Sequence, residues 1–256
     1  MAKKITEIAE SLHEWGLLKE LPKSLGSFTL REGSGINGNI LNIASYVDET
    51  NHCSVDLIYT GETFDYVVVK NVGLHTFRDD RFFTRDQDHF GEVVLKNLPG
   101  LLESMGKHNC RTMGYEAEEM GFASWDYWRK LPQKIGSFEL YITPDCPLEY
   151  INGSWIILDY SDFENGNQVM FLYNSFRNEL FAELKKGYLP LTTEEFNAHS
   201  LEKLTVLLEE KLQKTLNERI GQSFELVRSQ LENVQKGLGE MKNLAEDVGG
   251  LKKVLG

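Results

Sequence analysis

A ten-residue stretch occurs twice in this 256-residue chain, and this internal repeat limits the fold more than any other feature. Residues 21–30 read LPKSLGSFTL and residues 131–140 read LPQKIGSFEL, so that six of the ten positions are identical. Trp15 and Trp125 keep the same separation of 110 residues. Further along, the separation is 114, and the matched residues are Tyr46, Asp48, Val55 and Tyr59 with Tyr160, Asp162, Val169 and Tyr173. The sequence therefore predicts two similar units in tandem.

Each copy has the pattern of an α+β unit. A short amphipathic helix comes first, and four strand-like runs follow. In the second copy these runs lie near residues 136–142, 154–163, 168–173 and 179–185. Asn165-Gly166 between the second and third runs is typical of a tight hairpin, because both central residues of such a turn need positive φ. A closing helix is expected from Thr192, where Thr192 and Glu195 have capping-box spacing.

We therefore expect an α+β fold: a tandem repeat of a helix–four-stranded antiparallel meander–helix unit, followed by a long C-terminal coiled-coil helix. The predicted domains are residues 1–108 for the first repeat, 109–205 for the second and 206–256 for the C-terminal helix. In the first closing helix, Pro99 and Gly100 should kink or restart the chain. The second closing helix has Thr205 and Val206 instead and can run on.

Apolar residues recur at alternating steps of four and three in the C-terminal region. The predicted coiled-coil interface consists of Ile220, Phe224, Val227, Leu231, Val234, Leu238, Met241, Ala245 and Val248. The glycines at 237, 239, 249 and 250 each cost about 1 kcal/mol relative to alanine in a helix interior. Such a helix should be stable only against another helix, either in its own chain or in a second one. We expect self-association or docking on a partner helix, with a helix folded back on the body as the alternative.

Residues 210–255 resemble the coiled-coil segment of the RmuC family of DNA recombination proteins. The specific parts are LNERIGQSF, LENVQKGLGEM and VGGLKKVL, within about 46 residues. The resemblance implies a link to DNA recombination. It also implies a membrane-anchoring helix before the segment and a nuclease-like domain after it, and the sequence is expected to have neither. No catalytic residue of that family is therefore carried over, and no family is named for the duplicated body.

The net charge of −12 comes entirely from the first 200 residues, which hold 18 basic and 30 acidic residues. An acidic body repels phosphate backbones, so direct nucleic-acid binding by the body is not expected. No run reaches the ~18 apolar residues of a membrane-spanning helix, and no signal peptide is expected. Cys53, Cys110 and Cys146 match no metal or redox spacing, so free thiols and a cytoplasmic location are the simplest expectation.

An enzyme is the alternative hypothesis. Asp145, Glu183 and Lys185 have the order of a metal-dependent nuclease motif, in which carboxylates hold Mg²⁺ and the lysine positions water. The gap of 38 residues is long for that motif, and coincidence is the simpler explanation. A small-molecule site between the two repeats is a second form of this alternative. The aromatic run at residues 122–128 is expected to pack between the repeats rather than to line a ligand groove.

The favoured hypothesis is a non-enzymatic binding or oligomerisation protein linked to DNA recombination. We expect no cofactor and no metal site. The body would carry a recognition surface, and the C-terminal helix would associate with itself or with a partner.

Overall fold

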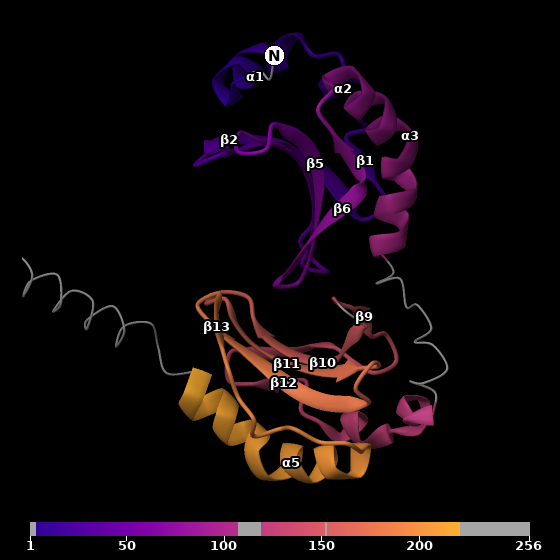
Figure 1. Cartoon of the computed structure of the whole chain (residues 1–256), viewed down its shortest axis with the longest axis vertical. Coiled ribbons are helices and arrows are strands. Elements are labelled where there is room, and N and C mark those ends of the chain that lie inside the picture. The colour runs from indigo at the N-terminus through magenta and orange to yellow at the C-terminus, as the bar shows by residue number, and fades with distance from the viewer. Residues whose placement is uncertain (1–3, 107–118, 152, 221–256) are drawn as a thin grey trace, which may run out of the picture.

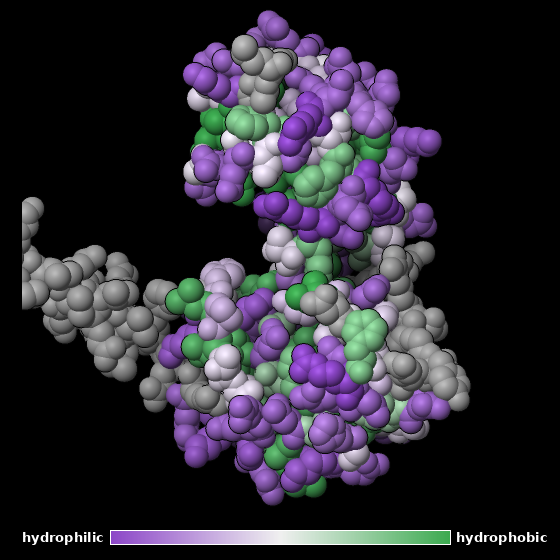
Figure 2. Space-filling model, viewed as in Figure 1, coloured by the Kyte–Doolittle hydropathy of each residue, from purple (hydrophilic) through white to green (hydrophobic). Residues whose placement is uncertain are grey.

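The computed structural model describes residues 4–106, 119–151 and 153–220 of the chain. Two antiparallel β-sheets form most of it, and each sheet carries helices on one face (Figure 1). We call residues 4–106 the first unit and the described residues from 119 to 220 the second unit. Figure 2 shows a hollow between the two units on the face that is viewed, with hydrophilic residues over most of the surface.

The first sheet is a six-stranded antiparallel meander in which each strand pairs with the next one along the chain. Its strands are β1 (Ser24–Leu25), β2 (Phe28–Asn37), β3 (Ile40–Asp48), β4 (Cys53–Thr60), β5 (Asp65–Val72) and β6 (His75–Thr84). Along β4, buried residues alternate with half-buried ones before a fully buried end, as expected for a strand with one face on the core. Short hairpin connections explain the simple strand order.

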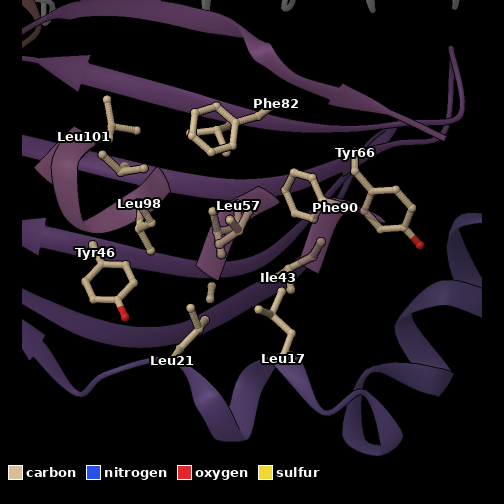
Figure 3. Close-up of a cluster of buried hydrophobic side chains, with 14 of the residues drawn as sticks. Leu17, Leu21, Ile43, Tyr46, Leu57, Tyr66, Phe82, Phe90, Leu98 and Leu101 are labelled. Carbon is tan, nitrogen blue, oxygen red and sulfur yellow. The ribbon is translucent and has the colours of Figure 1, made fainter. Parts of the chain in front are cut away.

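Helices cover one face of the first sheet. They are α1 (Ile5–Ser11), the 3₁₀ turn η1 (Leu12–Glu14), α2 (Leu17–Glu20) and the long helix α3 (Gln87–Gly106). Phe90, Leu98 and Leu101 of α3 point at the sheet, where they meet Leu57, Phe82 and other apolar residues (Figure 3). Burial of these side chains, at about 25 cal/mol per Å² of apolar surface, is the main force that holds α3 to the sheet.

The second sheet has seven strands. They are β7 (Lys134–Ile135), β8 (Phe138–Ile142), β9 (Leu148–Glu149), β10 (Ser154–Asp162), β11 (Asn167–Asn174), β12 (Glu179–Lys186) and β13 (Leu189–Leu191). The order across the sheet is β13-β12-β11-β10-β8-β7, and β9 pairs with β10 beside this path. All eight residues of β11 are buried, which indicates that both faces of this central strand are covered.

Helical segments cover the outer face of the second sheet. They are the 3₁₀ turns η2 (Phe122–Ser124) and η3 (Asp126–Lys130), the helix α5 (Leu201–Lys214) and one turn of π-helix, η4 (Thr215–Ile220). Ser200 caps α5 by accepting a hydrogen bond from the backbone nitrogen of Lys203 at 3.3 Å. The apolar face of α5 and η4 lies in the core of this unit, and it consists of Leu201, Leu204, Leu207, Leu208, Leu212 and Leu216.

The predicted fold of two helix–four-stranded meander–helix repeats with a long C-terminal coiled-coil helix is wrong. The sheets have six and seven strands instead of four. In the second sheet the additional strands β7, β9 and β13 have two or three residues, which is too short for an alternation that sequence reading detects, whereas the first sheet has a fifth long strand besides the short β1. In the part of the chain that is described, no long C-terminal helix is present. The leucines of α5 pack on their own sheet, so this apolar face is already occupied by β-strands and does not need another helix.

Several local predictions have different outcomes. The four runs expected in the second copy correspond to β8, β10, β11 and β12. The connection between β10 and β11 has four residues, and Gly166 has positive φ but Asn165 does not, so the turn differs from the predicted two-residue turn. The helix expected from Thr192 begins instead at Leu201. The first closing helix does not restart at Pro99, since α3 continues through this residue to Gly106.

The matched residues of the two copies keep equivalent hydrogen bonds, although the elements around them differ. The hydroxyl of Tyr46 donates to the carbonyl of Pro22 at 2.6 Å, and that of Tyr160 donates to the carbonyl of Pro132 at 2.6 Å. Burial raises the pKa of both tyrosines to about 12. The residues that the two copies share therefore form the same tyrosine-to-carbonyl hydrogen bond in each unit.

Replacement of a buried leucine on α5 tests whether this helix belongs to the core. Leu204→Ala should lower the free energy of unfolding by about 3 kcal/mol, because it leaves a cavity under the sheet. Val206→Ala, on the same helix but 41% exposed, should change it by less than about 0.5 kcal/mol. Urea unfolding followed by circular dichroism measures both variants, and equal effects would contradict the described packing.

Candidate functional site

The two units meet where hairpin ends of the first sheet lie on the inner face of the second sheet. The ring of His52 stacks on Phe163 with ring centroids 3.8 Å apart. The hydroxyl of Tyr141 donates to the carbonyl of Asn51 at 2.8 Å. Gly73, in the β5–β6 turn, lies so close to the ring of Tyr141 that a Cβ atom there would be 2.5 Å from it. Glycine is therefore required at this turn both by its φ of +58° and by the neighbouring ring.

A buried polar cluster lies at this junction. His75, the first residue of β6, places Nε2 3.1 Å from the carboxylate oxygen Oδ2 of Asp159 on β10. Gln168 on β11 donates from Nε2 to the same oxygen at 2.8 Å, and Ser161 donates from its hydroxyl to Oδ1 at 2.9 Å. The side chains of His75 and Asp159 are fully buried. Three donors from two units thus converge on one carboxylate.

The Nε2 atom of His75 has two close neighbours, Oδ2 of Asp159 at 3.1 Å and the amide Nε2 of Gln168 at 2.9 Å, and they favour different protonation of the ring. A carboxylate can only accept, so the contact with Asp159 is satisfied when Nε2 of His75 is protonated. The Nδ1 atom of His75 and the Oε1 atom of Gln168 then lack a hydrogen-bond partner among the described residues. Both atoms are acceptors in this arrangement. The cluster therefore depends on the charge of Asp159, which is its common acceptor.

Lys185 on β12 extends the cluster. Its Nζ atom donates to the backbone carbonyl of Leu74, beside His75, at 3.3 Å. Burial lowers the pKa of Lys185, and the nearby carboxylates of Asp159 and Glu183 act in the opposite direction. This lysine therefore adds a further connection between the second sheet and the β5–β6 turn.

A cleft with a volume of about 520 Å³ lies between the two units. The first unit contributes residues of β5, β6 and α3, and the second contributes Ile142, Trp155 and residues 146–149. Volumes of this size are typical of sites for small molecules. The lining includes three cationic side chains, those of Lys70, Arg81 and Lys96, and one acidic side chain, that of Glu149.

Asp79 organises two of these cations. Its carboxylate is almost fully buried and accepts hydrogen bonds from Nε and Nη2 of Arg81 at 2.8 and 2.6 Å. The Nζ atom of Lys70 lies 3.3 Å away from the same carboxylate. The hydrogen bonds from Arg81, assisted by the charges of Lys70 and Arg81, lower the pKa of Asp79 to about 2 although burial opposes them. The guanidinium of Arg81 is thereby held in one orientation.

The candidate nuclease residues do not form a cluster. Glu183 and Lys185 lie on the same face of β12, but Asp145 lies in the turn before β9, where the hydroxyl of Thr143 donates to it. Lys185 is bonded to Leu74. Among residues 4–106, 119–151 and 153–220, no group of three or more His, Cys, Asp or Glu side chains is arranged to hold a metal ion.

The predicted association residues lie almost entirely beyond the described residues. Ile220 ends η4, and the other eight, from Phe224 to Val248, lie outside the described residues. The aromatic run at residues 122–128 packs differently from the expectation. Phe122 and Trp125 are buried in the core of the second unit, not between the units.

Sequence reasoning missed the buried cluster and the cationic cleft. One signal was present. Asp159 directly follows the four apolar residues 155–158 of β10, and burial of its carboxylate without hydrogen-bond donors would cost free energy. Its partner His75 comes from 84 residues away, and no spacing rule connects the two. Lys70, Arg81 and Lys96 likewise meet only through tertiary packing.

Comparison with known proteins finds similarity in one short segment. The chain is 60% identical over 48 residues to the DNA recombination protein RmuC homolog of Xylella fastidiosa strain 9a5c, which is 19% of this chain and 10% of that protein. It is 62% identical over 45 residues to the RmuC homolog of strain Temecula1, which is 18% and 10% of the two lengths. The chain thus spans about a tenth of the length of these curated relatives. No family model and no solved structure matches.

These matches confirm the partial resemblance to RmuC proteins. Of the helices in the described ranges, none combines the length and apolar character that a membrane crossing requires. Cys53 is a free buried thiol, whereas Cys146 is disulfide-bonded. The expectation of three free thiols is therefore wrong for Cys146.

Removal of the common acceptor should destabilise the junction. Asp159→Ala leaves three buried donors without their partner and should lower the free energy of unfolding by about 3–5 kcal/mol. The matched control is Asp80→Ala, an exposed aspartate on β6, with an expected change within about 0.5 kcal/mol. Urea titration measures both variants, and a loss at Asp159 no larger than that at Asp80 would contradict the cluster.

The low pKa of Asp79 predicts an acid dependence of stability. Because the pKa falls from 3.8 to about 2 on folding, ionised Asp79 stabilises the protein above pH 4, and this contribution disappears as the pH falls towards 2. Since Arg81 is 67% exposed, we expect only about 1–2 kcal/mol. Asp79→Asn should be less stable than the unaltered protein at pH 6, with a difference that shrinks below pH 4 and vanishes only below pH 2. Urea unfolding across this range measures it, and a constant difference would contradict the assignment.

Proposed function

We propose that this chain is a non-enzymatic binding protein, in which the segment at residues 210–255 attaches the two-sheet body to a partner. One observation carries the proposal: about 60% identity to RmuC homologs is confined to 48 residues. Proteins that share only one segment are expected to share what that segment binds. The relatives are named DNA recombination proteins, so we propose the same process as the setting for this chain.

Self-association is the first partner that we propose. The nine apolar residues from Ile220 to Val248 would form the contact surface, since an apolar stripe loses free energy when it is removed from water. The body supports a role separate from the segment, because its two sheets are covered by their own helices, and α5 crosses residue 205 as part of the core. Substitutions in the full chain therefore test the proposal better than truncation.

Analytical ultracentrifugation of the full chain tests self-association. We expect a mass above the 29.3 kDa of one chain at micromolar concentration. Leu231→Glu with Leu238→Glu should shift the mass towards one chain, because two carboxylates are then placed in the apolar contact. Ser229→Glu with Asn243→Glu adds the same charge outside the apolar set and should leave the mass unchanged.

A second experiment distinguishes self-association from binding to an RmuC-like protein. The chain is mixed with the Xylella fastidiosa strain 9a5c RmuC homolog, and the sedimentation of the mixture is compared with that of each protein alone. A complex that the Leu231/Leu238 variant fails to form would support attachment to an RmuC-like protein. A chain that stays monomeric, alone and in the mixture, would refute the proposed role of the segment.

A further inference from the structure

We propose that the cleft between the two units is a binding site for an organic anion with an apolar body. The site is formed by α3, β5 and β6 on one side and by Ile142, Trp155 and residues 146–149 on the other. It is independent of the RmuC-like segment. Failure of either proposal would leave the other standing.

The cationic side chains of the cleft come from the first unit, and the acidic side chain of Glu149 comes from the second. Lys70 and Phe77 are directly opposite each other on β5 and β6, and Asp79 follows at an alternate position on the same face. Arg81 comes just after Asp79, where the register between the two strands shifts, and it also lines the cleft. This is the face of the sheet that α3 covers, since Val68, opposite Asp79, lies in the core with α3. The charges of Lys70 and Arg81 exceed that of Asp79 by one.

Arg81 retains donors for a ligand. A guanidinium has five N–H groups, and the hydrogen bonds to Asp79 use one on Nε and one on Nη2. The remaining three point along the other edges of a group that Asp79 has already oriented. Lys96 on α3 adds a third cation to the same lining. A carboxylate, sulfonate or phosphate is the group that such a set of donors recognises.

The cleft also has apolar lining, which both units contribute. Its lining includes Leu101 and Met105 of α3, Ile142 and Leu148 of the second unit and the ring of Trp155. A small inorganic anion would leave this surface exposed to water. A ligand that joins an anionic group to an aromatic or aliphatic body would contact the cationic and the apolar lining at the same time.

Gly100 keeps the cleft open on the side of α3. A Cβ atom added at this residue meets no other atom within 4 Å, so the helix surface there faces open space. A glycine within a helix costs about 1 kcal/mol relative to alanine, and neither a close contact nor a positive φ requires it here. Room for a ligand is the physical role that we assign to this glycine.

The probe is 8-anilinonaphthalene-1-sulfonate, an aromatic anion whose fluorescence rises in apolar surroundings. Its neutral counterpart, N-phenyl-1-naphthylamine, has the same rings without the sulfonate. Titration of both dyes into the folded full chain measures the two affinities. We expect saturable binding of the anionic dye, with an affinity at least about tenfold above that of the neutral dye, because the neutral dye makes no charge-assisted hydrogen bonds.

Three variants locate the site. Lys96→Gln removes one cation from an exposed helix position and should weaken the anionic dye about fivefold while it leaves the neutral dye unchanged. Arg78→Gln removes an exposed cation from the opposite face of β6 and should change neither affinity. Gly100→Leu fills the cleft and should abolish saturable binding of both dyes. Leucine favours the helix more than glycine does, so the fold should be retained.

The proposal is overturned by any of three results. One is equal affinity for the two dyes in the unaltered chain. Another is anionic-dye binding that Lys96→Gln and Arg78→Gln weaken equally, which would indicate a general charge effect. The third is undiminished binding in Gly100→Leu when circular dichroism shows a folded protein, because the dye would then occupy another surface.

Discussion

The charge of Asp159 is the constraint on which the junction of the two units depends. Its carboxylate accepts hydrogen bonds from His75 of the first unit and from Gln168 and Ser161 of the second, with both residues of the His75–Asp159 pair fully buried. A buried carboxylate is costly unless donors surround it, so its presence is tolerable only when the β5–β6 turn is seated on the second sheet. The same seating places Gly73 against Tyr141 and Lys185 against the carbonyl of Leu74.

The cleft follows from this junction. When the β5–β6 hairpin is fixed at its turn, the far part of β6 and the cleft-facing side of α3 stand opposite residues 146–149 and Trp155. Asp79 then holds Arg81 and Lys70 on the cleft wall. A chain with a net charge of −12 thus presents a local cationic surface, because packing concentrates three cations that the sequence keeps apart. Net charge alone would have argued against any anionic ligand.

Helix α5 belongs to the core of the second unit. The leucines of α5 complete the core of the second unit, and their apolar surface is removed from water within the body. In the sequence, helical periodicity continues from this region into residues 220–248, where the association surface is predicted. The same periodicity serves a helix on a sheet as well as a helix on a helix, since both need one apolar face.

Elements that depend on neighbouring residues can be predicted from the sequence. The four long strands of the second sheet, a hairpin between β10 and β11 and the resemblance of one segment to RmuC proteins could all be predicted from neighbouring residues. The tertiary structure alone decided the number of strands, the start of α5, the continuity of α3 at Pro99 and the meeting of His75 with Asp159. The physical reason is range: alternation and turn chemistry act over a few residues, whereas burial and charge pairing depend on residues that lie 84 positions apart in the chain.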